Sequence, residues 1–501
     1  MGHRKLPVND QSSYGQDKIL DSRKCKRSTE LSEFELSEER MRAIVDEAME
    51  RIVDFIGTLP EQPSNQLDGA EKAARLLIEP LPEEGEPYEG LLERLFDEVI
   101  PFGFNAASPG YLAYIPAGGL FQSALADFIA KSVNRFTSIW LPAPGLAQIE
   151  AVVVRWFCEV MGYPDEALGL LTTGGSMANF TAVFTARRER LEEDFLRGSI
   201  YVSDQMHHSM QKAAMLAGFP SSSVRVVSSD SDCRMRLDEL EELIEVDRAD
   251  GWQPFFVAGI AGTVNTGAVD DLAGIAAIAS AQGLWFHVDA AYGGLFMLTK
   301  RGRDVLNGIE LSDSMSLDPH KSLFIPYGTG SLLVRDRETL ARAHSTQADY
   351  LPTMRDDPDF IDFSEISPEL SRGHRGLGIW LPLKMHGAGA FRRQLDEKLD
   401  LAQWITEQLR EIKGIEIFAD PQLSLVTFRL VDPGLSDDEL NGLNRCFLQA
   451  VNDRRRVFMS HGVVGGKYVL RICVLSFRTH MPTMEIALED IRAVVDELIE
   501  N

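Results

Sequence analysis

Cysteine is scarce in this sequence, and its five copies are widely dispersed. They stand at positions 25, 158, 233, 446 and 473, with no CxxC pair and no histidine at ligand spacing. This distribution argues against a disulfide framework and against a zinc site. We therefore predict no bound metal and a reducing, cytoplasmic location.

Long apolar runs and an excess of positive charge are also missing. The longest apolar stretches, such as residues 255–260, have the length of a strand and fall well short of the ~20 residues that a membrane-spanning helix needs. Acidic residues outnumber basic residues by 76 to 50, which gives a formal net charge of −26. A surface of that sign repels nucleic-acid phosphates and anionic lipids, so we expect neither as a partner.

What the chain does contain is enough apolar sequence for several structural units, with 44% hydrophobic residues among 501. Residues 1–36 are basic in places but lack the apolar segment of a secretory signal, and we predict a disordered tail. Ser37 can cap a helix whose apolar residues recur every three or four positions up to Ile56. Residues 37–115 then form an N-terminal helical segment with a proline-rich, acidic connector.

Residues 116–390 alternate short apolar runs with helical periods of ten or more residues. This alternation predicts an α/β domain with a mainly parallel sheet. Ligands bind such sheets at the carboxyl ends of the strands, where Gly174-Gly175-Ser176, Asp204, Thr263 and Asp289 fall. Residues 391–501 mix helices and strands and predict a smaller C-terminal α+β domain.

Lys321 and Asp289 suggest the chemistry of the large domain. A lysine in a dry pocket can hold an aldehyde cofactor covalently, and a carboxylate beside a pyridine nitrogen keeps that nitrogen protonated. Together the two residues indicate pyridoxal phosphate as the cofactor. The Gly174-Gly175-Ser176 turn follows a strand and opens a helix, where backbone amides can bind the cofactor phosphate.

Each of these features also has a simpler interpretation. A Gly-Gly turn is commonly only a connection, and His207 with His208 can be a surface histidine pair. Asp289 can be a cap residue, and Lys321 a solvated lysine beside a proline turn. Their joint occurrence at strand ends of one domain favours a single site.

Four segments carry a resemblance to a known family. Residues 109–116, 201–207, 287–292 and 318–321 read PGYLAYIP, YVSDQMH, HVDAAY and DPHK. In this order they resemble the group II pyridoxal-dependent decarboxylases, which act on aromatic amino acids, histidine, glutamate or cysteine sulfinate. The resemblance implies the fold type I architecture of the aspartate aminotransferase class and a homodimer held by the segment 37–115.

The resemblance also implies roles for individual residues. Lys321 matches the Schiff-base lysine, Asp289 the partner of the pyridine nitrogen, and His207 the histidine that stacks on the ring. Further matches are Gly175 and Ser176 at the phosphate, His320 beside the phosphate, Ala291 on the second ring face, Thr263 as a hydroxyl contact, Tyr350 as the proton donor of a mobile loop, and Arg372 near the substrate.

The sequence departs from the family pattern at Asp318, at Ala117 and in the threonine run, which shortens to Gly262-Thr263-Val264 and leaves Thr263 as the one hydroxyl contact. Asp318 stands where the family usually has asparagine, and an acid close to a phosphate repels it unless the acid is protonated, paired or turned away. Ala117 replaces a threonine that lines the substrate pocket of the aromatic enzymes.

The expected reaction is loss of the α-carboxylate from an L-amino acid, giving the amine and carbon dioxide. Residues 110–142 contain few basic side chains beside aromatic ones such as Tyr114 and Trp140, which favours an aromatic substrate. Ser371 favours tyrosine or dihydroxyphenylalanine by analogy with plant relatives, with tryptophan next. The alternatives are a decarboxylase of acidic amino acids, an aromatic aldehyde synthase, and a catalytically silent protein that binds the cofactor.

Overall fold

The structure is a computed structural model that describes residues 32, 34–345 and 359–500. This part of the chain divides into two compact units, the first ending at Asp54 and the second beginning at Phe55. Helix α1 (Glu38–Gly57) starts as the sequence predicts, because the Ser37 hydroxyl accepts a hydrogen bond from the backbone N–H of Arg40 at 3.1 Å. Glu38 and Glu39 occupy its first turn, at the positive end of the helix dipole.

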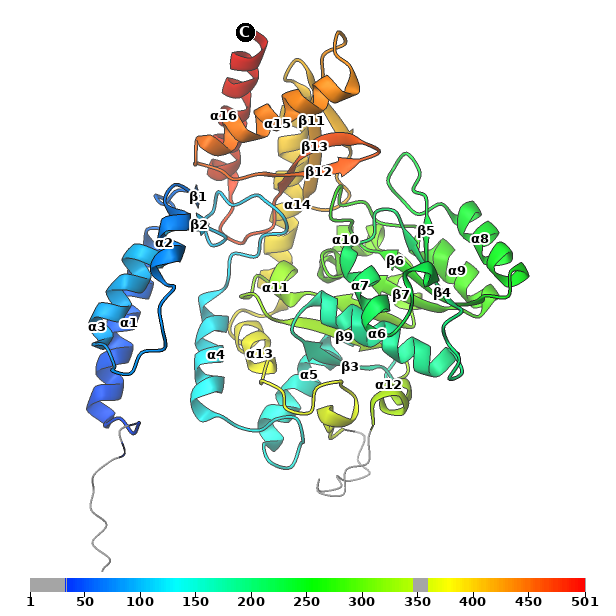
Figure 1. Cartoon of the computed structure of the whole chain (residues 1–501), viewed down its shortest axis with the longest axis horizontal. Coiled ribbons are helices and arrows are strands. Elements are labelled where there is room, and N and C mark those ends of the chain that lie inside the picture. The colour runs from blue at the N-terminus through cyan, green and yellow to red at the C-terminus, as the bar shows by residue number, and fades with distance from the viewer. Residues whose placement is uncertain (1–31, 33, 346–358, 501) are drawn as a thin grey trace, which may run out of the picture. The chain divides into compact units, whose positions relative to one another are not determined.

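The second unit contains a seven-stranded sheet at its centre (Figure 1). In spatial order its strands are β3 (Leu168–Thr172), β9 (Gly330–Val334), β8 (Ser314–Leu317), β7 (Trp285–Asp289), β6 (Gln253–Ile260), β4 (Gly198–Ser203) and β5 (Val224–Val227). Only β9 runs antiparallel to its two neighbours. The prediction of an α/β fold with a mainly parallel sheet is confirmed.

Apolar residues fill both faces of this sheet, as expected for parallel strands covered by helices. Phe256 and Ala258 of β6 belong to one buried cluster, whereas Val257 between them belongs to another. The helices that follow the strands are α6 (Gly175–Arg190), α7 (His208–Leu216), α8 (Leu237–Ala249), α9 (Leu272–Gln282), α10 (Lys300–Val305), α11 (Pro319–Ser322) and α12 (Arg337–His344). Because these helices follow the strands along the chain, the sheet fixes the positions of the turns between strand and helix.

The segment between α1 and the sheet is more structured than the sequence indicates. A short helix, α2 (Ala70–Leu76), lies in this segment, which also contains further elements. These are β1 (Asn65–Gln66), α3 (Tyr88–Glu93), a π-helix (Arg94–Val99) and β2 (Gly103–Phe104). Helices α4 (Phe121–Val133), α5 (Pro144–Val160) and α13 (Gly376–His386) pack together beside the sheet.

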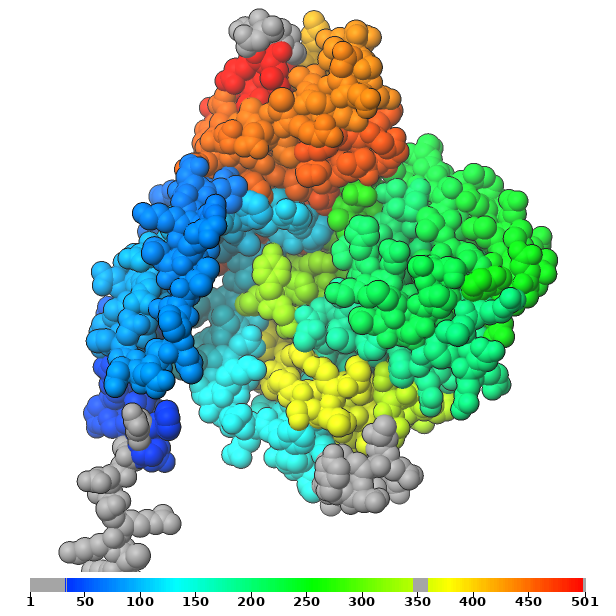
Figure 2. Space-filling model, viewed as in Figure 1, coloured from blue at the N-terminus to red at the C-terminus, as the bar shows by residue number. Residues whose placement is uncertain are grey.

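The C-terminal residues form a second, antiparallel sheet with its own core, seen as the orange and red lobe of Figure 2. Its strands, in spatial order, are β10 (Ile415–Ala419), β11 (Leu425–Leu430), β13 (Lys467–Cys473) and β12 (Ser460–Val464). The helices are α14 (Ala388–Arg410), α15 (Asp437–Asp453) and α16 (Met481–Glu500). This agrees with the α+β character predicted for residues 391–501. Among the described helices, none is long and apolar enough to cross a membrane.

Candidate active site

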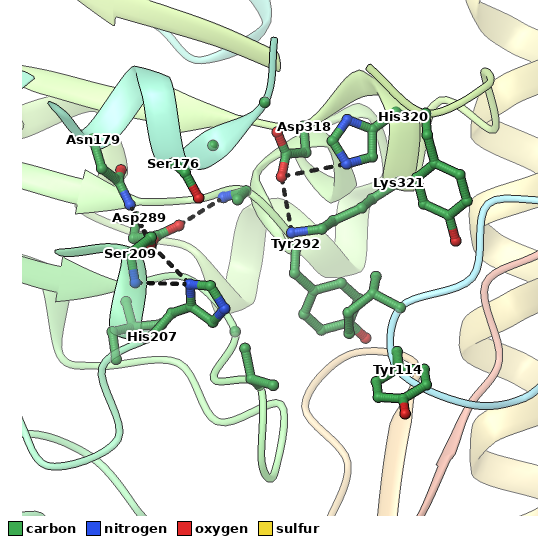
Figure 3. A pocket seen from close by; sticks show the side chains of 18 of the residues that line it. Tyr114, Ser176, Asn179, His207, Ser209, Asp289, Tyr292, Asp318, His320 and Lys321 are labelled. Atoms are coloured by element: carbon green, nitrogen blue, oxygen red, sulfur yellow. Dashed lines mark hydrogen bonds and ion pairs between the residues drawn. The ribbon is translucent and has the colours of Figure 1, made fainter. Parts of the chain in front are cut away.

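A cavity of about 470 Å³ opens at the carboxyl ends of the parallel strands (Figure 3). Its walls come from the turns after β3, β4, β6, β7 and β8, which places chemically different side chains around one space. Of the residues predicted from the sequence, the cavity brings together Tyr114, Gly175, Ser176, His207, Asp289, Ala291, His320 and Lys321.

The turn from β3 into α6 forms one end of the cavity. The first N–H groups of α6, at Gly175 and Ser176, have no carbonyl of a preceding turn to bind and can receive an anion. Strand β9 approaches this turn closely, because a Cβ on Gly330 would lie 2.5 Å from the carbonyl carbon of Gly174. Residue 330 can therefore carry no side chain while the turn keeps this position.

Asp289 ends β7 and is held by three donors. Its Oδ2 accepts a hydrogen bond from Asn179 Nδ2 at 2.9 Å, and its Oδ1 accepts from the backbone N–H of Ala291 at 3.2 Å and from Ser316 Oγ at 3.3 Å. The residue is only 8% exposed. These three donors fix the direction of the carboxylate.

A chain of hydrogen bonds from strands β7 and β8 supports Asn179. Because Asn179 Nδ2 donates to Asp289, its Oδ1 accepts from His287 Nε2 at 3.1 Å. Trp285 Nε1 donates to Ser314 Oγ, which then donates to Nδ1 of His287 at 2.8 Å. Burial lowers the pKa of His287, so the ring is neutral and its single proton lies on Nε2.

His207 follows β4 and caps α7. The backbone N–H of Ser209 donates to His207 Nδ1 at 3.2 Å, so the ring proton lies on Nε2. Ser209 Oγ lies 2.8 Å from the same nitrogen and accepts from Asn179 Nδ2 at 3.0 Å. Burial is the largest cause that lowers the pKa of His207. The imidazole is thus neutral, with its orientation coupled to that of Asp289.

Lys321 lies on α11, the short helix after β8, and its Nζ is 2.9 Å from Asp318 Oδ2. Burial lowers the pKa of Lys321, but the nearby Asp318 carboxylate outweighs burial and the pKa is raised. His320 Nδ1 donates to the backbone carbonyl of Thr329 at 2.7 Å, and its Nε2 is 3.7 Å from Asp318 Oδ2. Asp318 therefore has both residues as neighbours (Figure 3).

Four other predicted site residues do not line this cavity. Thr263 is buried and bonds Thr266, although its neighbours Gly262 and Val264 reach the wall. Ala117 is buried, and Trp140 stacks on Phe360 with 4.2 Å between ring centroids.

Arg372 is the fourth, and its side chain is fully buried. Its Nη2 binds Glu150 Oε1 at 2.7 Å and the carbonyl of Leu171 at 2.5 Å. Direct substrate contacts by Arg372, Ala117 and Trp140 stay predictions, and Tyr350 lies outside the described residues.

Sequence reasoning missed Asn179, Ser209 and Ser316, which orient the predicted residues. Asn179 had a signal, because it falls four positions after Gly175, one turn into the helix that starts at the cavity. Ser316 gave a weaker sequence signal than Asn179, because a serine within a short strand does not indicate which residue it contacts.

The cavity fits pyridoxal phosphate chemically. It offers an amine for the aldehyde, helix-terminal amides for the phosphate, a fixed carboxylate for the pyridine nitrogen and a neutral imidazole for the ring face. No group of three or more histidine, cysteine, aspartate or glutamate side chains suited to a metal occurs in the described ranges.

Comparison with known proteins agrees with this chemistry. The family described as the pyridoxal-dependent decarboxylase conserved domain matches residues 71–431. An aromatic-L-amino-acid decarboxylase of Bacillus atrophaeus is 33% identical over 467 residues, 93% of this chain and 97% of that protein. A phenylacetaldehyde synthase of Arabidopsis thaliana is 26% identical over 452 residues, covering 88% and 92% of the two chains.

Among solved structures, a tryptophan decarboxylase of Catharanthus roseus in complex with L-tryptophan has the same fold. It superposes with a TM-score of 0.86 at 26% identity and covers 92% of this chain and 99% of that chain. The similarity therefore extends over the large sheet and the C-terminal domain together.

Proposed function

Because this chain belongs to the pyridoxal-dependent decarboxylases, we propose that it converts an aromatic L-amino acid to the amine and carbon dioxide. Tyrosine and dihydroxyphenylalanine are the first candidates, and tryptophan is the next. The observation that carries the aromatic assignment is the cavity wall, which contains Tyr111, Tyr114, Tyr292 and Tyr327. Among its described lining residues Lys321 is the only lysine or arginine, so an acidic side chain would find no dedicated cation.

Pyridoxal phosphate, once bound, supplies an aldehyde and a ring that accepts the electron pair of the broken bond. Lys321 would hold the aldehyde, and the N-terminus of α6 the phosphate. Asp289 would keep a proton on the pyridine nitrogen, and its three donors hold it in one orientation for that task. Neutral His207 can lie against a protonated ring without charge repulsion.

Tyr350 is proposed as the proton donor to the α-carbon, on the strength of the family resemblance alone. The alternative function is that of an aldehyde synthase, in which the same site gives an aldehyde. The similarity of this chain to the phenylacetaldehyde synthase favours that alternative. His207 and Tyr350, both present here, argue for the amine instead.

We also propose that the protein is a homodimer. Helix α4 leaves a row of apolar side chains exposed, with Phe128 at 53%, Ile129 at 42% and Val133 at 49%. The segment around α2 adds Leu77 and Ile78, the latter 80% exposed. Large apolar patches on a protein surface mark interfaces. The patch around α2 lies within the predicted dimerisation segment 37–115, and α4 follows that segment in the sequence. Light scattering tests this, and a monomer would contradict it.

We propose a cytoplasmic location because the cysteines are dispersed along the chain. Cys158, Cys233, Cys446 and Cys473 are all free thiols in the described part of the chain. Reduced, unpaired cysteines are typical of a reducing compartment.

The experiment that tests the activity is a substrate panel. The purified chain, loaded with pyridoxal phosphate, is incubated with each common L-amino acid and with dihydroxyphenylalanine, and products are identified by mass spectrometry. We expect amine from aromatic substrates and little from glutamate or aspartate. Aldehyde with hydrogen peroxide would identify an aldehyde synthase, amine from acidic substrates would overturn the aromatic assignment, and no product from a loaded protein would indicate a silent one.

A further inference from the structure

Asp318 and Lys321 form an ion pair inside the cavity, with 2.9 Å between Oδ2 and Nζ. Asp318 is 3% exposed. Its second oxygen, Oδ1, is buried and has no hydrogen-bond partner among the described residues. The carboxyl therefore has one short contact, to the amine that must hold the cofactor (Figure 3).

The same carboxyl lies beside the turn that receives the phosphate. A Cβ built on Gly175 would stand 3.1 Å from Asp318 Oδ2, and Gly175 is the first residue of α6. A phosphate at the start of this helix would meet an ionised Asp318 at short range. Two buried negative charges repel strongly, because little water screens them.

Lys321 must also change its charge. A protonated amine has no lone pair for an aldehyde carbon, and the Asp318 carboxylate favours the protonated form. The acceptor in hydrogen-bond contact with Lys321 Nζ is Asp318 Oδ2 itself. The other titratable groups around this pair are His320 and Tyr327 next to α11, His207 before α7, Asp289 on β7 and Cys473 on β13.

We propose that Asp318 takes a proton from Lys321 when pyridoxal phosphate binds and then stays protonated, donating its O–H to the phosphate. One proton passes from Nζ to Oδ2, and a carbon–nitrogen double bond forms. The two remaining amine protons leave with the aldehyde oxygen as one water. A single proton shift thus creates the nucleophile and removes the charge that repels the phosphate.

This assignment explains how an aspartate can replace the asparagine that is usual in the family. An asparagine amide donates hydrogen bonds, whereas a carboxyl donates only when it is protonated. A protonated Asp318 therefore keeps a donor at this position. The inference rests on the cofactor of the family and not on the proposed substrate.

Infrared difference spectroscopy on the full chain, with and without pyridoxal phosphate, tests the proposal directly. We expect cofactor binding to produce a band of a protonated carboxyl that shifts in deuterium oxide. The band should be absent from Asp318→Asn, which keeps the shape of the side chain and should still bind the cofactor. Asp313→Asn is the matched control, since Asp313 accepts from the backbone N–H of Phe286 and lies outside the cavity wall; this variant should keep the band.

Two results would overturn the proposal. A native spectrum without the band would mean that Asp318 stays ionised when the cofactor is bound. A band that persists in Asp318→Asn would assign the proton to another carboxyl. If the variant cannot be purified, carbon-13 labelling of aspartate in the native chain must move the band, and an unmoved band would count against Asp318.

Discussion

Asn179 Oδ1 lies 3.1 Å from His287 Nε2, and the amide group of the same asparagine donates to Asp289 at 2.9 Å. The neutral His287 ring thus fixes which way the asparagine amide faces. That orientation in turn holds the Asp289 carboxylate, which we propose as the partner of the pyridine nitrogen. The Asn179 side chain thereby connects His287, inside the sheet, with Asp289 in the cavity wall.

Replacing Asn179 by alanine should therefore lower turnover without unfolding the protein. Loss of a hydrogen bond to a charged group is worth about 1.5–3 kcal/mol, which corresponds to a rate about 10- to 150-fold lower. Steady-state kinetics and the cofactor absorbance spectrum measure the effect. Thr181→Ala on the same helix is the control, because the Thr181 hydroxyl binds the carbonyl of Met177 within α6. An equal loss in both variants would contradict a specific role for Asn179.

Residues at the end of a buried strand, or within a few positions after it, were predictable from the sequence. Asp289, His207 and Lys321 each stand at such a place, so the parallel sheet brings them to one edge. Asn179 gave only the weaker signal of lying one turn after Gly175, since the rotation of α6 about its axis is set by packing against the sheet.

Strand β8 shows a second limit of the sequence pattern. Its residues Ser314 and Ser316 are fully buried, but they are polar because they bind His287 and Asp289. A buried strand that alternates serine with apolar residues looks like an exposed segment. The two serines make this strand hard to recognise in the sequence, and the same serines orient His287 and Asp289.

Arg372 offers a test between a structural and a substrate-binding role. Its fully buried guanidinium pairs with Glu150, and removing one partner of such a pair costs about 3–5 kcal/mol of unfolding free energy. We expect Arg372→Ala to be destabilised by about this amount in urea denaturation. Glu150→Ala should show a similar loss, because it removes the carboxylate that lies 2.7 Å from the buried guanidinium.

The substrate-binding alternative for Arg372 predicts a different pattern. In that case Arg372→Lys would raise KM while the urea midpoint stayed close to that of the native chain. A variant with normal stability and a raised KM would therefore contradict the structural role.

Stability should fall in mild acid because of His344. Burial lowers the pKa of this histidine from 6.5 to about 4, and its Nε2 lies 3.0 Å from Thr185 Oγ1. Since the folded pKa is the lower one, its contribution is complete above pH 6.5 and is lost as the pH falls towards 4. The full shift corresponds to about 3 kcal/mol. Urea midpoints measured at intervals between neutral pH and pH 4 should drop less in His344→Gln than in the native chain, and parallel curves would argue against this source.

Tyr350→Phe addresses the proton donor predicted from the family resemblance. Without the hydroxyl, the α-carbon waits longer for its proton and oxygen can react with it instead. We expect less amine and more aldehyde and peroxide from the same amount of consumed substrate. Product ratios by mass spectrometry decide this, and an unchanged amine yield would remove Tyr350 from the mechanism.

Lys321→Ala is the most direct test of the site as a whole. Lys321 is the only lysine among the described residues of the cavity wall, so its loss removes the amine that we propose to hold the cofactor aldehyde. We expect no covalent cofactor absorbance and no detectable turnover, with the phosphate site of α6 still able to bind the cofactor weakly. Lys300→Ala, an exposed lysine at the start of α10, should behave as the native chain. Normal absorbance in Lys321→Ala would mean that another amine holds the cofactor, which would also remove the basis for a proton shift to Asp318.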